Sequence, residues 1–212
     1  MLSMGFKDQL RKLIRWCVSR RATWLFSATF PSSVDNLIKG AMKSTPKIIQ
    51  VSQTQVVNRD ITHCYKLCER DQKDDVVYEF LNDQEDDRGI IFCRTKASAN
   101  MLGKRLAQMD FDVDVITGDL TQQERDKVIR GFRKGRAQFI IATDVVARGI
   151  DIQGLSFVLH YQLPDQHEYY THRAGRTGRA GNKGISLLLL EARDRRQLNQ
   201  LEKALHIDFD EY

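Results

Sequence analysis

From residue 47 onward, short apolar runs alternate with longer segments whose apolar residues recur every three or four positions. The short runs have the length of β-strands, and the longer segments have the periodicity of amphipathic helices. The predicted strands are 47–51, 61–68, 89–93, 113–116, 138–142, 156–160 and 185–190; the predicted helices are 1–21, 34–42, 71–81, 96–108, 121–133, 166–173 and 193–205. Apolar strands that alternate with helices predict an α/β fold with a parallel sheet covered by helices on both faces.

The loops that follow these strands are polar, and ligands bind at the carboxyl ends of strands in such folds. Arg94-Thr95-Lys96 follows strand 89–93, Thr117-Gly118-Asp119 follows strand 113–116, and His160-Tyr161 lies at the end of strand 156–160. The run 142–151 combines a threonine, an arginine and two carboxylates. A hydroxyl and backbone N–H groups can bind phosphate, whereas the carboxylate of Asp151 can accept hydrogen bonds from sugar hydroxyls. Taken alone, each loop could equally be a solvated turn or a helix cap.

The segment 172–181, which we call the arginine segment, has arginines at 173, 176 and 179 and glycines at 175, 178 and 181. A spacing of three would place the arginines on nearly one face of a helix. Glycines disfavour a helix, so we expect the backbone to bend or to be approached closely there. Guanidinium groups suit phosphate oxygens, and the segment therefore predicts a polyphosphate contact. The alternative is a solvated basic face.

A second feature is the start of the helix predicted at 121–133. Thr121 and Glu124 have the spacing of a capping box, which predicts the first turn of that helix. This assignment leaves Gln122 and Arg125 available for another role.

Composition narrows the functional classes. Lys and Arg number 33 against 28 Asp and Glu, and the formal net charge of +5 suits a polyanionic partner. No apolar run approaches the roughly 20 residues of a membrane span, and no signal peptide is expected. Cys64 and Cys68 lack further ligands for a zinc site, so we predict no metal site and free thiols in a reducing cytoplasm. The sequence has no Walker A loop and no G-x-S-x-G nucleophile elbow.

Together and in this order, the segments resemble the DEAD-box RNA helicases of superfamily 2. The resemblance rests on Ser27-Ala28-Thr29, Ile90 to Lys96, Gly118-Asp119, Gln122 to Arg125, Thr143 to Asp151, and His172 to Arg179. It implies a RecA-like domain, the second of two in these P-loop NTPase-like helicases. Residues 1–30 would be a remnant of the first RecA-like domain that follows its Asp-Glu-Ala-Asp box. Residues 31–60 would be the linker and the first elements of the second domain, which would occupy 61–212.

The resemblance also implies residue roles. Arg176 and Arg179 would be arginine fingers on the ATP γ-phosphate, with His172 coupling that site to the other motifs. Asp151 would bind the ribose of ATP. RNA would contact Arg94, Gly118, Arg125 and Thr143. Coupling between the two domains would involve Ser27, Thr29, Gln122, Arg148 and Arg173.

The function implied is the C-terminal half of an ATP-dependent RNA helicase, inactive as an isolated fragment. Its partners would be RNA, bound without regard to sequence, and the N-terminal RecA-like domain, which would hold most of the Mg²⁺ contacts. ATP would be the cofactor, and no membrane is involved. One alternative is a stand-alone nucleic-acid-binding regulatory module without ATPase function, and another is half of a DNA helicase. The sequence does not identify the RNA that is remodelled.

Overall fold

The computed structural model describes residues 7–26, 47–49, 58–144, 152, 154–179 and 181–212. The chain divides into two compact units, Met1–Val51 and Ser52–Tyr212. Their boundary lies within the predicted linker range of 31–60, and the assignment of 1–30 to a first RecA-like domain stays a prediction.

In the first unit the helix predicted at 1–21 is present as α1 (Lys7–Trp16), and the prediction is wrong for residues 17–21, which are described but not helical. The helix predicted at 34–42 lies outside the described residues. The strand predicted at 47–51 is wrong for residues 47–49, which are not in a strand. Ile48 and Ile49 have the residue types of a strand, but they pair with no described strand, and both side chains are exposed. Strand propensity without a hydrogen-bonded neighbour does not make a strand.

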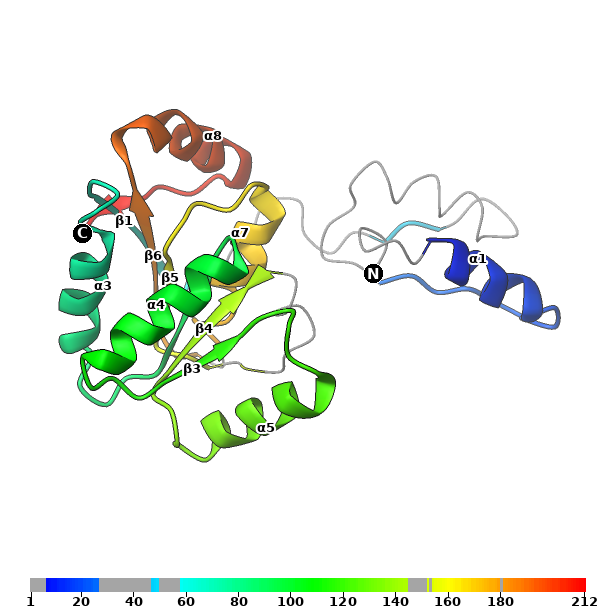
Figure 1. Ribbon diagram of the computed structural model, residues 1–212. Helices are drawn as coiled ribbons and strands as arrows, with labels where there is room; N and C mark the ends of the chain where they lie inside the picture. The colour runs from blue at the N-terminus through cyan, green and yellow to red at the C-terminus, as the bar shows by residue number, and fades with distance from the viewer. Residues whose placement is uncertain (1–6, 27–46, 50–57, 145–151, 153, 180) are drawn as a thin grey trace. The chain divides into compact units, whose positions relative to one another are not determined.

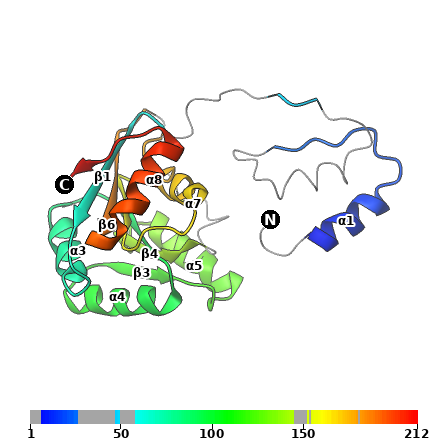
Figure 2. The same cartoon turned by 90° about the horizontal axis from the view of Figure 1, so that it is seen from above.

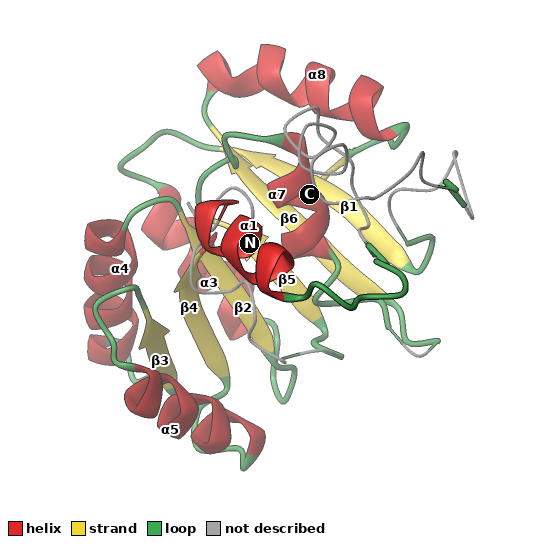
Figure 3. Cartoon of the chain, turned by 90° about the vertical axis from the view of Figure 1, so that its right-hand side faces the viewer, coloured by secondary structure: helices red, strands yellow, loops and turns green. Residues whose placement is uncertain are grey.

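The second unit is built on one sheet whose paired strands are all parallel, in the order β3-β4-β2-β5-β6-β1-β7 (Figures 1 and 3). Its strands are β1 (Ile61–Leu67), β2 (Gly89–Cys93), β3 (Val113–Ile116), β4 (Phe139–Thr143), β5 (Phe157–His160), β6 (Gly184–Leu190) and β7 (Asp210–Glu211). Its helices are α3 (Lys73–Asn82), α4 (Lys96–Gln108), α5 (Gln122–Arg133), α7 (His167–Ala174), the short 3-10 helix η2 (Ala192–Asp194) and α8 (Arg195–Leu205). The predicted α/β fold is confirmed.

Sequence reasoning missed β7, which has two exposed residues and pairs with β1 at the edge of the sheet. So short a strand has no alternating pattern to detect, and only its neighbour defines it.

The two faces of the sheet are covered by different helices (Figure 2). Helices α3 and α4 pack on one face through residues such as Val77 and Leu102. Helices α5, α7 and α8 pack on the other face through residues such as Phe132, Tyr170 and Leu201. Successive strand residues alternate between these cores, and because both faces are covered the central strands β2, β4 and β5 are buried along their whole length and mostly apolar.

Two helices that begin at the carboxyl edge of the sheet are capped by threonine side chains, one of them as predicted. The Thr121 side chain accepts a hydrogen bond from the Glu124 N–H, and the Glu124 carboxylate accepts one from the Thr121 N–H, so the predicted capping box is confirmed. Thr95 caps α4 in the same way by accepting from the Ser98 N–H at 3.0 Å. The caps fix where the polar loops end and the helices begin.

The first residue of β6, Gly184, lies close to the chain that follows α7. A Cβ at Gly184 would collide with the Thr177 hydroxyl and lie 2.8 Å from the Gly178 nitrogen. Gly184→Ala should therefore lower the free energy of unfolding by about 1–3 kcal/mol through overpacking, measured by urea titration. Gly118→Ala is the control, because its Cβ would meet only the flexible Lys96 side chain, at 3.2 Å. Equal stability of the two variants would contradict this packing.

Candidate functional site

The polar loops predicted to bind ligand meet at one edge of the sheet. β4 lies between β3 and β2, and the register pairs Ile116 with Ala142 and Cys93 with Thr143. The residues predicted to contact RNA after these strands, Arg94, Gly118 and Thr143, are thereby brought to the same carboxyl edge. Thr143 is buried, so it can offer a ligand less surface than the other two.

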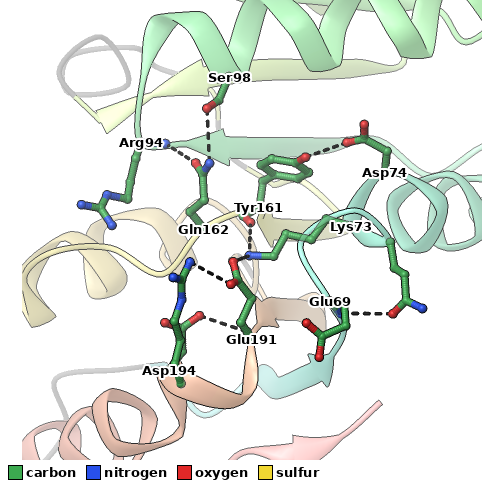
Figure 4. A network of polar contacts seen from close by, with 11 residues as sticks. Glu69, Lys73, Asp74, Arg94, Ser98, Tyr161, Gln162, Glu191 and Asp194 are labelled. Atoms are coloured by element: carbon green, nitrogen blue, oxygen red, sulfur yellow. Dashed lines mark hydrogen bonds and ion pairs between the residues drawn. The ribbon is translucent and has the colours of Figure 1, made fainter.

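Arg94 is held at its backbone and exposed at its side chain (Figure 4). Its N–H donates to Gln162 Oε1 at 2.8 Å, and Gln162 Nε2 donates to Ser98 Oγ at 3.2 Å. The guanidinium pairs with Asp165 at 2.9 Å, and the side chains are 53% and 63% exposed. Such an exposed pair contributes little stability, about 0–1 kcal/mol, so a phosphate could replace Asp165 at low cost.

Gly118 lies against the Lys96 side chain, whose ammonium group pairs with Asp119. The loop after β3 and the start of α4 therefore present a cation beside a backbone that carries no side chain. That arrangement allows the close approach of a nucleic-acid backbone.

Gln122 and Arg125 lie in the first turn of α5 but differ in surroundings. The Gln122 amide is exposed and donates to Asp126 at 2.9 Å. Arg125 is half-buried, and its Nε is a buried donor with no hydrogen-bond partner in the described part of the chain. A buried donor without an acceptor is costly, and an anion bound here would satisfy it.

Arg173 makes the most buried ion pair at this edge. Its side chain is 1% exposed, and Nε and Nη2 donate to the two carboxylate oxygens of Asp144 at 2.6 and 2.7 Å. Nη1 donates to the Gln162 carbonyl at 3.0 Å. Asp144 directly follows Thr143, so this pair ties α7 to the end of β4. These contacts of Arg173 lie within the second unit, and its predicted part in coupling two domains stays a prediction.

The rest of the arginine segment lies at the opposite edge of the sheet. Thr177 donates through its hydroxyl to the carbonyls of Leu155 and Ser156, just before β5. Gly178 lies against Ile61, the first residue of β1, and has φ +64°, as Gly181 has φ +80°. The predicted bending at glycines is confirmed at these two positions, and the predicted close approach is confirmed at Gly178.

The three arginines consequently do not share a helical face, because α7 ends at Ala174. Arg173 is buried, Arg176 is half-buried and Arg179 is exposed, as is His172. Arg179 Nε donates to the Gly175 carbonyl at 2.6 Å, which folds its side chain back along the segment. Arg176 and Arg179 thus project from a backbone that is fixed by Thr177 between them.

Lys73 is a buried residue that sequence reasoning missed. It is 4% exposed, pairs with Glu191 at 3.4 Å and donates to the Tyr161 carbonyl at 3.5 Å (Figure 4). Burial disfavours the charge of Glu191, but Lys73 and Arg193 outweigh it and hold the pKa of that carboxyl below its usual value. The available signal was position, since Lys73 precedes the buried Val77 by one helical turn. These contacts join α3 to the ends of β5 and β6.

The described residues contain no group of three or more His, Cys, Asp or Glu side chains that could hold a metal ion. All four cysteines are unpaired. Burial raises the pKa of the Cys93 thiol to about 12, although Arg173 works in the opposite direction. A thiol of that pKa is not a nucleophile at neutral pH. No described helix is long and apolar enough to cross a membrane.

Four residues given roles by the resemblance, Ser27, Thr29, Arg148 and Asp151, lie outside the described residues. Their predicted roles stay predictions.

Comparison with known proteins supplies a family for this fold. The profile described as "Helicase conserved C-terminal domain" matches residues 72–181. The chain is 38% identical over 203 residues to the ATP-dependent RNA helicase DbpA of Bacillus subtilis, covering 96% of this chain and 42% of DbpA. It is 36% identical over 203 residues to eukaryotic initiation factor 4A of Caenorhabditis elegans, covering 95% and 50%. The chain thus spans half or less of the length of these curated relatives.

Solved structures agree with that match. Saccharomyces cerevisiae Dbp5 bound to RNA and ADP BeF3 superimposes with a TM-score of 0.84 at 32% identity, covering 99% of this chain and 56% of Dbp5. The C-terminal domain of the DEAD-box protein Dbp5, solved alone, gives a TM-score of 0.68 at 35% identity, covering 72% and 89%. The isolated domain matches over nearly its whole length, so the second unit has the fold of such a domain.

The burial of Arg173 makes its partner a sensitive position. Asp144→Ala should leave a buried guanidinium without its carboxylate and lower the free energy of unfolding by about 3–5 kcal/mol. Asp165→Ala removes the carboxylate of the exposed Arg94 pair and should cost about 0–1 kcal/mol. Urea titration of both variants measures the difference. Similar losses in the two variants would show that burial does not set the strength of these pairs.

Proposed function

The chain belongs to the helicase C-terminal domain family, as the second RecA-like domain of a DEAD-box RNA helicase, and from this premise we propose that it completes an ATP site whose other part belongs to a first RecA-like domain. Arg176 and Arg179 are the proposed arginine fingers, with His172 and Asp151 assisting at the γ-phosphate and the ribose. The first domain would supply the Walker A loop and most of the Mg²⁺ contacts.

The observation that carries this proposal is the pair of hydrogen bonds that holds the backbone of the arginine segment in place. Arg176 and Arg179 flank Thr177, whose hydroxyl is buried and bonded to two backbone carbonyls at the amino edge of the sheet. A fixed backbone between two guanidinium groups is a preorganised arrangement for stabilising charge on a transferring phosphoryl group. Guanidinium groups on a freely moving loop would have to be ordered at each turnover.

The RNA-binding part of the proposal rests on the opposite edge of the sheet. Positive charge comes from Arg94 and Lys96, and the backbone at Gly118 allows close approach because it carries no side chain. These features do not distinguish one base from another. We propose that this edge, with Thr143 and Arg125, holds the RNA backbone through phosphates and 2′-hydroxyls, independent of sequence. That the relative Dbp5 was solved with RNA and ADP BeF3 supports both ligand classes.

In the proposed mechanism, ATP and single-stranded RNA draw the two domains together. Closure would bring Arg176 and Arg179 to the γ-phosphate and would bend the RNA strand, which separates a short duplex. Hydrolysis would remove the contact that holds the domains closed and let them open. The predicted coupling residues Ser27, Thr29, Gln122, Arg148 and Arg173 would transmit closure between the two ligands.

The unpaired cysteines support a reducing, cytoplasmic location.

The test uses the longer protein that carries both RecA-like domains. Arg176→Ala and Arg179→Ala should each lower RNA-stimulated ATPase turnover by about 10³ to 10⁵, the range known for arginine fingers in phosphoryl transfer. Arg196→Ala is the matched control, because it removes an exposed arginine from α8, away from the segment. Release of phosphate is measured with and without RNA.

Near-normal turnover in both variants would reject the finger assignment. RNA binding without any stimulated hydrolysis in the unmodified protein would favour a nucleic-acid-binding regulatory module instead. Replacing RNA by DNA of the same sequence decides the substrate, and equal stimulation by DNA would contradict an RNA helicase.

A further inference from the structure

Arg173 is the first member of a buried network that crosses the second unit from α7 to β1. Arg173 Nη1 lies 3.4 Å from His160 Nδ1, and His160 Nε2 lies 3.0 Å from Ser186 Oγ. Ser186 Oγ lies 3.0 Å from the Tyr170 hydroxyl, which in turn bonds to His63 Nδ1. The five side chains are between 0% and 8% exposed. We call these five residues the buried network.

The Arg173 guanidinium determines which atom donates and which accepts in each hydrogen bond of the buried network. A guanidinium group has donors and no acceptor, so His160 Nδ1 must accept and the ring hydrogen must be on Nε2. Nε2 then donates to Ser186 Oγ, which leaves the serine hydrogen for the Tyr170 oxygen. Tyr170 donates its own hydrogen to His63. In this arrangement the hydroxyl hydrogens of Ser186 and Tyr170 and the Nε2 hydrogen of His160 each have an acceptor within the network; reversing the Ser186–Tyr170 bond leaves the serine hydrogen without one among the described residues.

The packing around His160 enforces the neutral form of its ring. The ring stacks on Tyr170 with centroids 4.9 Å apart and lies beside Phe92. The titratable and charged groups around it are Arg173, Asp144, Cys93, Tyr170 and His63, from α7, the ends of β4 and β2, and β1. Burial, and then the charge of Arg173, place the pKa of His160 well below its ordinary value. Protonation would put a hydrogen on Nδ1 facing the Arg173 N–H.

We propose that three members of the buried network, His160, Ser186 and Tyr170, are positioning residues. Their directed hydrogen bonds hold the Arg173 guanidinium in the orientation that engages both oxygens of Asp144. They thereby fix the end of α7, from which the arginine segment starts. This inference deepens the proposed function, because that segment carries the proposed fingers. Sequence reasoning named His160 as part of a polar strand end but gave it no role, and it did not single out Ser186 or Tyr170.

The first test observes the network directly by ¹⁵N NMR of the 212-residue chain, with neither ATP nor RNA present. At pH 7 the His160 ring should carry its hydrogen on Nε2, and the Arg173 Nε–H should exchange slowly with solvent. Tyr170→Phe and Ser186→Ala should each speed that exchange roughly tenfold, because each removes one hydrogen bond from the row. Either variant suffices if the other fails to fold.

Tyr161→Phe is the matched control. It removes a tyrosine hydroxyl that donates to Asp74 at 2.6 Å on the other face of the sheet, and it should leave the exchange of Arg173 unchanged. A hydrogen on His160 Nδ1 at pH 7, or unchanged Arg173 exchange in the Tyr170 and Ser186 variants, would overturn the proposal.

The second test measures how exchange of the Arg173 Nε–H depends on pH, a dependence that packing alone would not produce. A histidine with a lowered folded pKa stabilises the fold above the unfolded pKa of about 6.5 and loses that contribution as pH falls toward the folded pKa. His63, whose pKa burial lowers to about 4, contributes in the same direction. The protection of the Arg173 Nε–H, which is its exchange rate relative to that of an unstructured arginine at the same pH, should therefore fall as pH drops below about 6.5.

His160→Gln offers one acceptor and one donor but does not titrate, so it should flatten the part of this profile due to His160. An identical profile in this variant would overturn the proposal. Because these measurements need no turnover, they separate the two ideas. A confirmed network with fully active Arg176 and Arg179 variants would reject the function alone, and inactive variants with an unchanged Arg173 would reject the network alone.

Discussion

The ion pair between Arg173 and Asp144 is the interaction on which the arrangement of both proposed sites depends. Arg173 lies where α7 enters the arginine segment, and Asp144 follows the strand that ends at the edge proposed to bind RNA. A guanidinium that is 1% exposed is stable only with its charge and all its donors satisfied. Because both carboxylate oxygens and a carbonyl are engaged, α7 has one position relative to the end of β4.

Because α7 is held in this single position, one short helix connects the carboxyl edge of the sheet with the amino edge. α7 begins near the carboxyl edge, where Gln162 and Asp165 bound the loop beside Arg94. The segment after it passes to the amino edge, where Thr177 is bonded in front of β5. The residues proposed for RNA and those proposed for ATP are therefore separate in space but joined by one rigid element. Rigid elements with few alternative positions are what energetic coupling between two ligands requires.

The sequence predicted the sheet, its helices and the capping box, because periodicity and side-chain capping are local properties. It failed at residues 47–49 and at β7, where a strand depends on its neighbours. For the candidate site, the sequence identified the arginine segment. It predicted that the three arginines would share nearly one face if the segment were helical. The fold separates them, because α7 ends at Ala174, and Gly178 then takes a left-handed backbone conformation that a helix does not allow. Lys73 and Ser186 were not found, and His160 was named only as part of a polar strand end, since the partners of these residues come from segments distant in sequence.

The central claim is that this domain completes an ATP site that it does not hold alone. Its most direct test is phosphate release from ATP by the first RecA-like domain, with and without this chain added and with and without RNA. The account predicts negligible turnover by either domain alone and RNA-stimulated turnover by the two together. Turnover by the 212-residue chain alone, or no gain when the domains are combined at concentrations where they associate, would contradict it.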